Sequence, residues 1–245
     1  SSSAASDVYK RQVLKNNRPE LGGIWHYGVG TKITGSDNDT IIYGANGTYE
    51  IYYEAISNGK IVTSDIFTVT VTNVFDEWMG LFTGAKDKAD ADATKAWGFR
   101  EVKWGSVCNM GAHGGWKYTS SGYTPESNFA WWGSVNLAQA GDQKIVFEIQ
   151  GTKVKTYDKS GNLMNEGTFG FDRDQPEDLV QGRLTTNIPV ISSNYDDLGQ
   201  SKGKDNVFWI LTLTDEYITL YHPQKYTGGG DWDDYGWYVY YESKE

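Results

Sequence analysis

The chain has 245 residues, of which 15% are aromatic, and it carries a formal net charge of −10. This charge argues against binding to nucleic acid or to an anionic membrane surface, because both need basic side chains. The single cysteine excludes an intrachain disulfide framework and a cysteine-based zinc site, and no apolar run has transmembrane length. Abundant aromatic and β-branched residues favour strands, and twenty-nine glycines suit many tight turns. We therefore expect an all-β protein of one or two domains.

We expect residues 1–12 to form a tail that does not belong to the folded domains. They show no basic start followed by an apolar run, so no signal peptide is visible. The run DVYKRQ at 7–12 resembles the in-frame translation of a transposon adapter from a sequencing library. This resemblance predicts that native sequence begins near Val13, with an ordinary disordered tail as the alternative.

Residues 13–74 predict a small antiparallel sandwich. Asn46-Gly47 indicates a turn before the strand-like run GTYEIYYEAI at 47–56. Asn58-Gly59 is a hairpin signal. The run KIVTSDIFTVTVTN at 60–73 then alternates between apolar and polar residues, as a strand with one buried face does.

The order of these parts resembles a PKD domain, an immunoglobulin-like module of exported proteins. The matching segments are WHYGVG at 25–30, GTYEIYYEAI at 47–56 and TVTVTN at 68–73. Val29 departs from the acidic turn residue of that family, and the family's first strands would precede Val13. The resemblance implies a spacer or adhesion module of an extracellular protein.

Residues 75–94 predict a linker. The run VFDEWMGLFTG at 74–84 suits a short helical turn, and the polar run KDKADADATKA follows it. Asp90 and Asp92 raise the question of a calcium loop, but the EF-hand pattern of oxygens, glycine and terminal glutamate is absent. A solvated loop is the favoured interpretation.

Residues 95–245 predict a second, larger domain of short strands joined by tight connections, a jelly-roll-like β-sandwich. Two of these connections, at 158–162 and 214–216, have hairpin length. In the last strand Trp237, Val239 and Tyr241 share one face. Strand-like runs cover 95–104, 143–152, 153–161, 166–172, 206–214, 216–223 and 236–244.

Two glycine-rich segments of this domain hold the candidate ligand-binding residues. The first, at 109–133, contains candidates His113, Trp116, Trp131 and Trp132. Adjacent side chains of an extended segment point to opposite sides, so we expect one of the last two to pack inward and the other to face a ligand. Burial of both under loops is the alternative for this pair, and a purely structural role is the alternative for the histidine.

The second segment, GGGDWDDYGW at 228–237, contains the candidates Asp231, Trp232 and Asp233. Trp and Tyr stack on the apolar faces of sugar rings, and carboxylates and imidazole bond sugar hydroxyls. An ordinary hairpin loop with solvated charges is the alternative. No cofactor is predicted; calcium stays open, because these acids, with Asp196 and Asp197, carry the oxygens it prefers.

The order of motifs also resembles the C-terminal β-sandwich of Bacteroidetes surface glycan-binding proteins. This resemblance implies a lipoprotein at the cell surface, anchored in the outer membrane, that binds a polysaccharide or oligosaccharide and works with other outer-membrane glycan-uptake proteins. The matching runs are AWGF (96–99), GAHGGW (111–116), AWWGS (130–134), ILTLTDEYITLY (210–221) and GWYVYYES (236–243).

An enzyme is the main alternative. Glycosidases need two carboxylates across a bond, and the strand-like runs offer only Glu148, Glu166 and Asp172, without a closely spaced pair. No nucleophile elbow or histidine zinc motif occurs in the sequence. We therefore expect a non-catalytic polysaccharide-binding protein. A β-sandwich glycoside hydrolase or lyase and a structural adhesion module stay open as alternatives.

Overall fold

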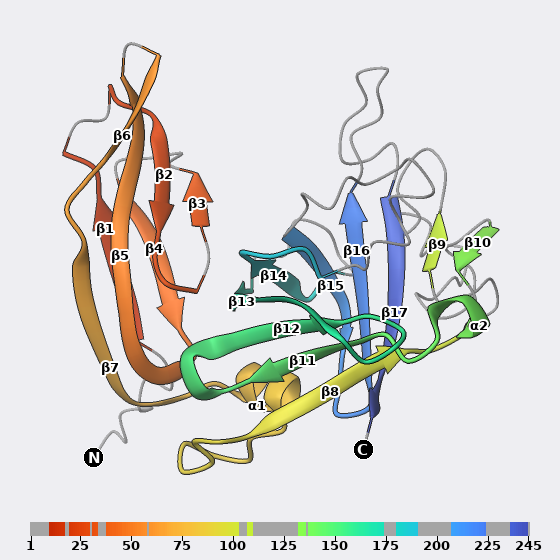
Figure 1. Ribbon diagram of the computed structural model, residues 1–245. Helices are drawn as coiled ribbons and strands as arrows, with labels where there is room; N and C mark the ends of the chain where they lie inside the picture. Colours follow the sequence, from red (N-terminus) through yellow and green to blue (C-terminus); the bar gives the residue numbers. More distant parts are fainter. Residues whose placement is uncertain are drawn as a thin grey trace.

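The computed structural model describes residues 10–17, 20–29, 31–33, 38–57, 59–102, 107–109, 132–135, 137–173, 180–190, 207–223 and 236–244. Nearly all the regular structure in them is strand, which confirms the all-β class. The strands form two parts, an N-terminal sandwich and a larger C-terminal barrel (Figure 1).

The N-terminal sandwich has one two-stranded and one five-stranded sheet. The long central strand β5 pairs with β7 along its first half and with β2 and β6 along its second half. Strand β1 begins at Lys10, which pairs with Tyr43, so it includes the last three residues of the expected tail. The strands are β1 (Lys10–Lys15), β2 (Gly23–His26), β3 (Thr31–Ile33), β4 (Asn38–Tyr43), β5 (Ala45–Ser57), β6 (Lys60–Thr63) and β7 (Phe67–Phe75).

One of the two turn predictions in the sandwich is confirmed and the other is wrong. Ser57 pairs with Lys60, so a two-residue hairpin joins β5 and β6, and Gly59 has the positive φ of 75° that such a turn needs. Asn46, in contrast, lies inside β5 at a bulge, where its side-chain oxygen accepts a hydrogen bond from Val74 N–H at 2.9 Å. The asparagine thus bonds the neighbouring strand, and does not reverse the chain.

The C-terminal part is a closed barrel of eight described strands. Each strand pairs antiparallel with the next, and the last, β17, pairs with the first, β8, through contacts such as Tyr241 with Phe99. A jelly roll would instead distribute its strands between two sheets. The barrel strands are β8 (Thr94–Phe99), β11 (Lys144–Glu148), β12 (Lys153–Tyr157), β13 (Leu163–Asp172), β14 (Gly182–Thr186), β15 (Val207–Leu213), β16 (Tyr217–Pro223) and β17 (Gly236–Lys244).

The inside of the barrel is a packed core. Alternate residues of each strand point inward, as the two-residue period of a strand requires. Val239 and Tyr241 are among them, which agrees with the predicted face of the last strand. These inward residues, all buried, include Trp97, Phe99, Ile145, Phe147, Val154, Phe169, Leu184, Phe208, Ile210, Ile218, Leu220, Val239 and Tyr241.

The predicted linker contains part of that core. Helix α1 (Glu77–Thr83) buries Phe82, whose ring centroid lies 5.0 Å from that of Phe147 and 5.7 Å from that of Phe169. Trp97 donates its indole N–H to the Phe82 carbonyl at 2.9 Å. The helix therefore covers one end of the barrel, where Figure 1 shows it beside β8 and β11.

The sandwich contacts the barrel at the same end. The Arg173 guanidinium, just after β13, binds the Asp76 carboxylate between β7 and α1 with two 2.8 Å hydrogen bonds. Gly170 of β13 lies so close to Val29 that a Cβ on the glycine would be 2.6 Å from the valine carbonyl oxygen. Ala45 of β5 belongs to the barrel's own core cluster. The two parts therefore share packed surface at the end that α1 covers.

Candidate functional site

The barrel has two distinct ends, fixed by the direction of its strands. At the end covered by α1, called the helix end, the connections at 149–152, 173–181 and 214–216 are short or intermediate. At the opposite end, called the connection end, the strands are joined by 158–162 and by three long segments, 100–143, 187–206 and 224–235.

The described strands that flank both candidate segments meet them at the connection end. Most of the candidate ligand-binding residues lie outside the described part of the chain, so only the strands that flank them are placed. Trp132 is described in its backbone alone, at the start of β10. The residues outside are His113, Trp116, Trp131, Asp231, Trp232 and Asp233.

The 109–133 segment starts and ends in a two-stranded ladder. Asn109, the last residue of β9 (Val107–Asn109), pairs with Trp132, the first residue of β10 (Trp132–Val135). Strand β9 also pairs with β17, where Val107 opposes Val239, just beyond the β8–β17 pairs. The ladder therefore extends the barrel wall beyond β8 at the connection end, as Figure 1 shows beside β17.

The short helix α2 (Leu137–Ala140) links this ladder back to β11. Leu137 N–H donates to the Glu101 carboxylate at 2.9 Å, which ties the helix to the residues that follow β8. Leu137 is exposed, as are Leu163 and Met164 at the start of β13. Apolar side chains are thus exposed at the connection end on both sides of the β11–β12 pair.

Two buried polar atoms lie on the inner wall of the barrel beside the end of β8. Tyr241 Oη and Gln143 Oε1 are both inaccessible to solvent and make no hydrogen bond within the part of the chain that the structure describes. Tyr241 pairs with Phe99, its ring 4.9 Å away, and Gln143 precedes Lys144, the partner of Gly98. Burial raises the pKa of the Tyr241 phenol, which therefore stays protonated. Apart from buried threonines such as Thr156 and Thr186, the other inward side chains of the described barrel strands are aliphatic or aromatic, so we expect ligand contacts at the connections and not inside the core.

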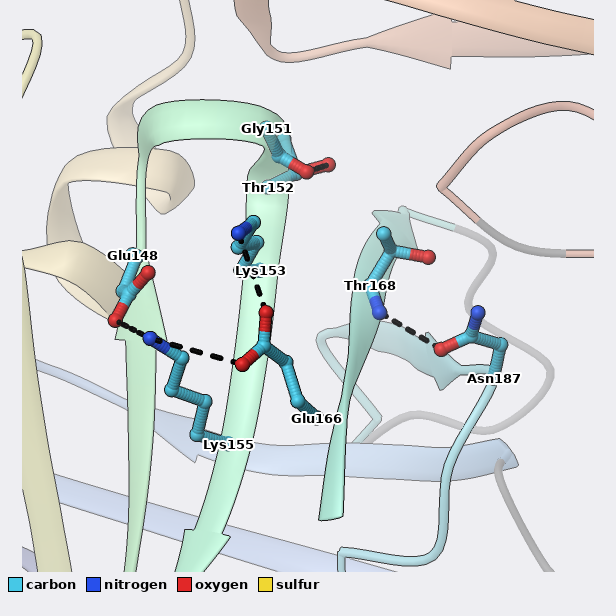
Figure 2. Close-up of polar contacts among 8 residues, drawn as sticks. All are labelled: Glu148, Gly151, Thr152, Lys153, Lys155, Glu166, Thr168 and Asn187. Carbon is cyan, nitrogen blue, oxygen red and sulfur yellow. Dashed lines mark hydrogen bonds and ion pairs between the residues drawn. The ribbon is translucent and has the colours of Figure 1, made fainter. Parts of the chain in front are cut away.

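A second polar cluster lies on the outer face of β11, β12 and β13 (Figure 2). Lys155 Nζ bonds the Glu148 carboxylate at 2.6 Å and lies 4.0 Å from Glu166, which also binds Lys153 at 3.2 Å. The hydrogen bond to Glu148 raises the pKa of Lys155, and Glu166 adds to the effect. The two glutamates are distant in the sequence, and only the register across the two hairpins brings them to one lysine.

This cluster does not resemble a hydrolase pair. A glycosidase keeps one carboxyl group protonated as the acid and the other free as base or nucleophile. Here Lys155 bonds Glu148 and lies 4.0 Å from Glu166, which Lys153 also binds, so both carboxylates are engaged in ion pairs across the strands. Figure 2 also shows Asn187, whose side-chain oxygen accepts a 2.7 Å hydrogen bond from Thr168 N–H and fixes the chain after β14 against β13. The arrangement is that of a stabilised strand surface.

The loop at 84–93 contains Asp90 and Asp92, the two acids that raise the question of a calcium site. Asp90 accepts a hydrogen bond from Lys86 N–H at 2.6 Å, and Asp87 accepts one from Ala89 N–H at 2.6 Å. The carboxylates therefore order the loop itself, beside an open depression of about 510 Å³ that Asp90 and Asp92 help to line. Within the described residues, no group of three or more His, Cys, Asp or Glu could hold a metal ion.

Two tryptophans of the barrel strands differ in their surroundings. Trp97 is fully buried, whereas Trp209 is partly exposed on the outer face, where Arg183 lies 5.6 Å from its ring centroid. Trp104 and the side chain of Trp237 lie outside the described residues.

None of the helices in the described residues is long and apolar enough to cross a membrane. No protein-family model matches the sequence, and a comparison with curated proteins finds no match.

Proposed function

We propose that the protein is a non-catalytic polysaccharide-binding protein of the cell surface, whose ligand binds at the connection end of the barrel. One observation supports the proposal: the described strands that flank the two aromatic segments, 109–133 and 228–237, meet those segments at the same end of the barrel. Segments distant in the sequence therefore start from one side of the molecule. The opposite end is occupied by α1 and the sandwich.

Glycan is the favoured ligand class because of the residues in those segments. Three tryptophans in the first and Trp232 in the second can stack on sugar rings, at about 1 kcal/mol for each ring. His113, Asp231 and Asp233 supply hydrogen-bonding groups for hydroxyls. A neutral or weakly acidic polysaccharide needs no basic surface, so the net charge of −10 is compatible with it.

The sandwich acts as a spacer in this proposal. Its described contacts with the barrel, such as those through Asp76 and Val29, lie on the helix-end side, and the proposal assigns the connection end to the ligand. Outer-membrane anchoring and cooperation with other glycan-uptake proteins belong to the same proposal and rest on the resemblance to surface glycan-binding proteins. The proposal leaves open the binding of calcium by the acidic residues of the 228–237 segment.

Affinity electrophoresis of the full chain in gels with neutral or weakly acidic polysaccharides tests the proposal. We expect retardation by at least one polysaccharide, weakened about fivefold by substitution of a single stacking tryptophan. The variants are Trp116→Ala, Trp131→Ala, Trp132→Ala and Trp232→Ala.

Phe67→Ala is the matched control, because this exposed aromatic belongs to the sandwich. Retardation that no tryptophan variant changes would remove the connection end as the site. Release of new reducing ends from the retained polysaccharide would instead support the hydrolase alternative.

A further inference from the structure

The sandwich has an unprotected edge at strand β6. Among the described strands, β6 pairs with β5 alone and lies at the end of its sheet. Every residue from 59 to 68 is exposed. Four of these are large and apolar: Ile61 is 71% exposed, Val62 55%, Ile66 58% and Phe67 67%. Natural sheets normally protect such an edge, because its unpaired backbone groups can pair with another strand.

The hairpin register shows which backbone groups of β6 are available. Lys60 pairs with Ser57 next to the two-residue turn, so these two residues bond to each other. The bond from Ser64 N–H to the Tyr53 carbonyl at 2.8 Å continues this alternation. The N–H and C=O groups of Ile61 and Thr63 therefore point away from β5, toward the free edge.

We propose that this edge binds a second copy of the chain by antiparallel pairing of β6 with β6. A two-fold axis through Val62 pairs Ile61 of each copy with Thr63 of the other, which uses all four outward groups of each strand. Val62 then faces its own counterpart, and the apolar side chains of the two edges cover each other.

The charges at the two ends of the β6 edge favour a second copy of the chain as the partner, and they favour antiparallel pairing. The exposed Lys60 begins the strand, and the exposed Asp65 follows its end. Antiparallel pairing brings the lysine of one copy to Ser64 and Asp65 of the other, whereas parallel pairing would bring like charges together. The segment is therefore complementary to itself, which is what a two-fold interface requires. The proposal does not depend on glycan binding.

Sedimentation velocity of the full chain across a concentration series is the first test. We expect a monomer–dimer equilibrium that Thr63→Pro weakens about tenfold or more, because proline removes an outward N–H without touching a β5–β6 bond. Ile61→Lys should weaken the dimer similarly. Thr70→Lys, exposed on β7, is the matched control and should leave the equilibrium unchanged.

Cysteine crosslinking tests the register. In a Cys108→Ser background, Val62→Cys should give an oxidised dimer, because directly opposed residues of this kind have Cα atoms about 4.5 Å apart. Ile61→Cys should not crosslink, since its counterpart is then a diagonal neighbour about 7–8 Å away. A chain that stays monomeric, a dimer insensitive to Thr63→Pro and Ile61→Lys, or crosslinking at 61 and not at 62 would each overturn the proposal.

Discussion

The carboxylate of Asp76 accepts two 2.8 Å hydrogen bonds from the guanidinium of Arg173 while its residue is only 1% exposed. The same carboxylate accepts the Trp78 N–H at 2.8 Å and so caps the start of α1. Arg173 lies 4.6 Å from the centroid of the Trp78 ring. A single side chain thus joins the end of β7, the start of α1 and the end of β13. It holds the sandwich, the helix and the barrel together.

Replacement of Asp76 should therefore be costly. Breaking a buried pair costs about 3–5 kcal/mol, but the Arg173 side chain is 38% exposed, so we expect Asp76→Ala to lower the free energy of unfolding by about 2–3 kcal/mol. Asp76→Asn keeps an acceptor for the helix cap and should cost less. Denaturant titration measures both, with Glu242→Gln as the control.

The control removes the pair between Glu242 and Lys244, whose side chains are 39% and 45% exposed. Such exposed pairs contribute about 0–1 kcal/mol, so the Glu242→Gln change should be small. Equal costs for Asp76→Ala and Glu242→Gln would contradict the role given to Asp76.

Gly170→Ala should weaken the contact between sandwich and barrel. The added Cβ would lie 2.6 Å from the Val29 carbonyl oxygen, which is backbone and cannot rotate away. We expect a loss of about 1–3 kcal/mol in unfolding free energy, as in other overpacked sites. Gly22→Ala is the matched control, because nothing lies within 4 Å of its added Cβ. Unchanged stability of Gly170→Ala would show that the two parts do not pack here.

Phe82→Ala should show that α1 belongs to the barrel core. The ring is fully buried against Phe147 and Phe169, so its removal should cost about 3–5 kcal/mol. Phe67→Ala removes the same side chain from an exposed position and should change stability by less than about 0.5 kcal/mol. Thermal or denaturant unfolding measures both changes in stability. Similar losses of unfolding free energy for the two variants would exclude a core role for the helix.

Tyr49 should make stability depend on pH in the alkaline range. Burial raises the pKa of this tyrosine from 10.0 to about 12, so the folded state favours its neutral form. The resulting stabilisation is complete below pH 10 and is lost as the pH rises to about 12, by up to about 2–3 kcal/mol.

The variant Tyr49→Phe tests this dependence. It lacks the 2.9 Å bond to the Ala45 carbonyl and should be less stable at neutral pH, but its unfolding free energy should fall less steeply above pH 10. Denaturant titrations at a series of pH values measure the difference. Parallel profiles for the two proteins would contradict the prediction.

Local features were predictable where neighbours in the sequence decide the structure. Turn chemistry predicts the β5–β6 turn at Gly59 and the connections at 158–162 and 214–216. In the 158–162 connection, Asp158 accepts N–H bonds from Ser160 and Asn162. Strand β14 at Gly182–Thr186 was missed, although Leu184 is fully buried. Its run GRLTT is too short for alternation to distinguish it from a loop.

The candidate site was predictable only as two separate segments. Composition singled out 109–133 and 228–237, but their spatial relation depends on which way each barrel strand runs. The Glu148–Lys155–Glu166 cluster was not anticipated either, since it joins three strands across two hairpins. Contacts of this kind depend on register, which a single sequence specifies weakly.

The sequence by itself determined the all-β class, most of the strands, the hairpins and the residue types available for a ligand, because these follow from side-chain alternation and turn chemistry. Only the tertiary structure decided that β8 pairs with β17 to close a barrel, and that Phe82 of the expected linker fills its core. The physical reason is that ring closure and core packing join residues far apart in the chain. Their pairing is selected by the total buried surface and not by any local pattern.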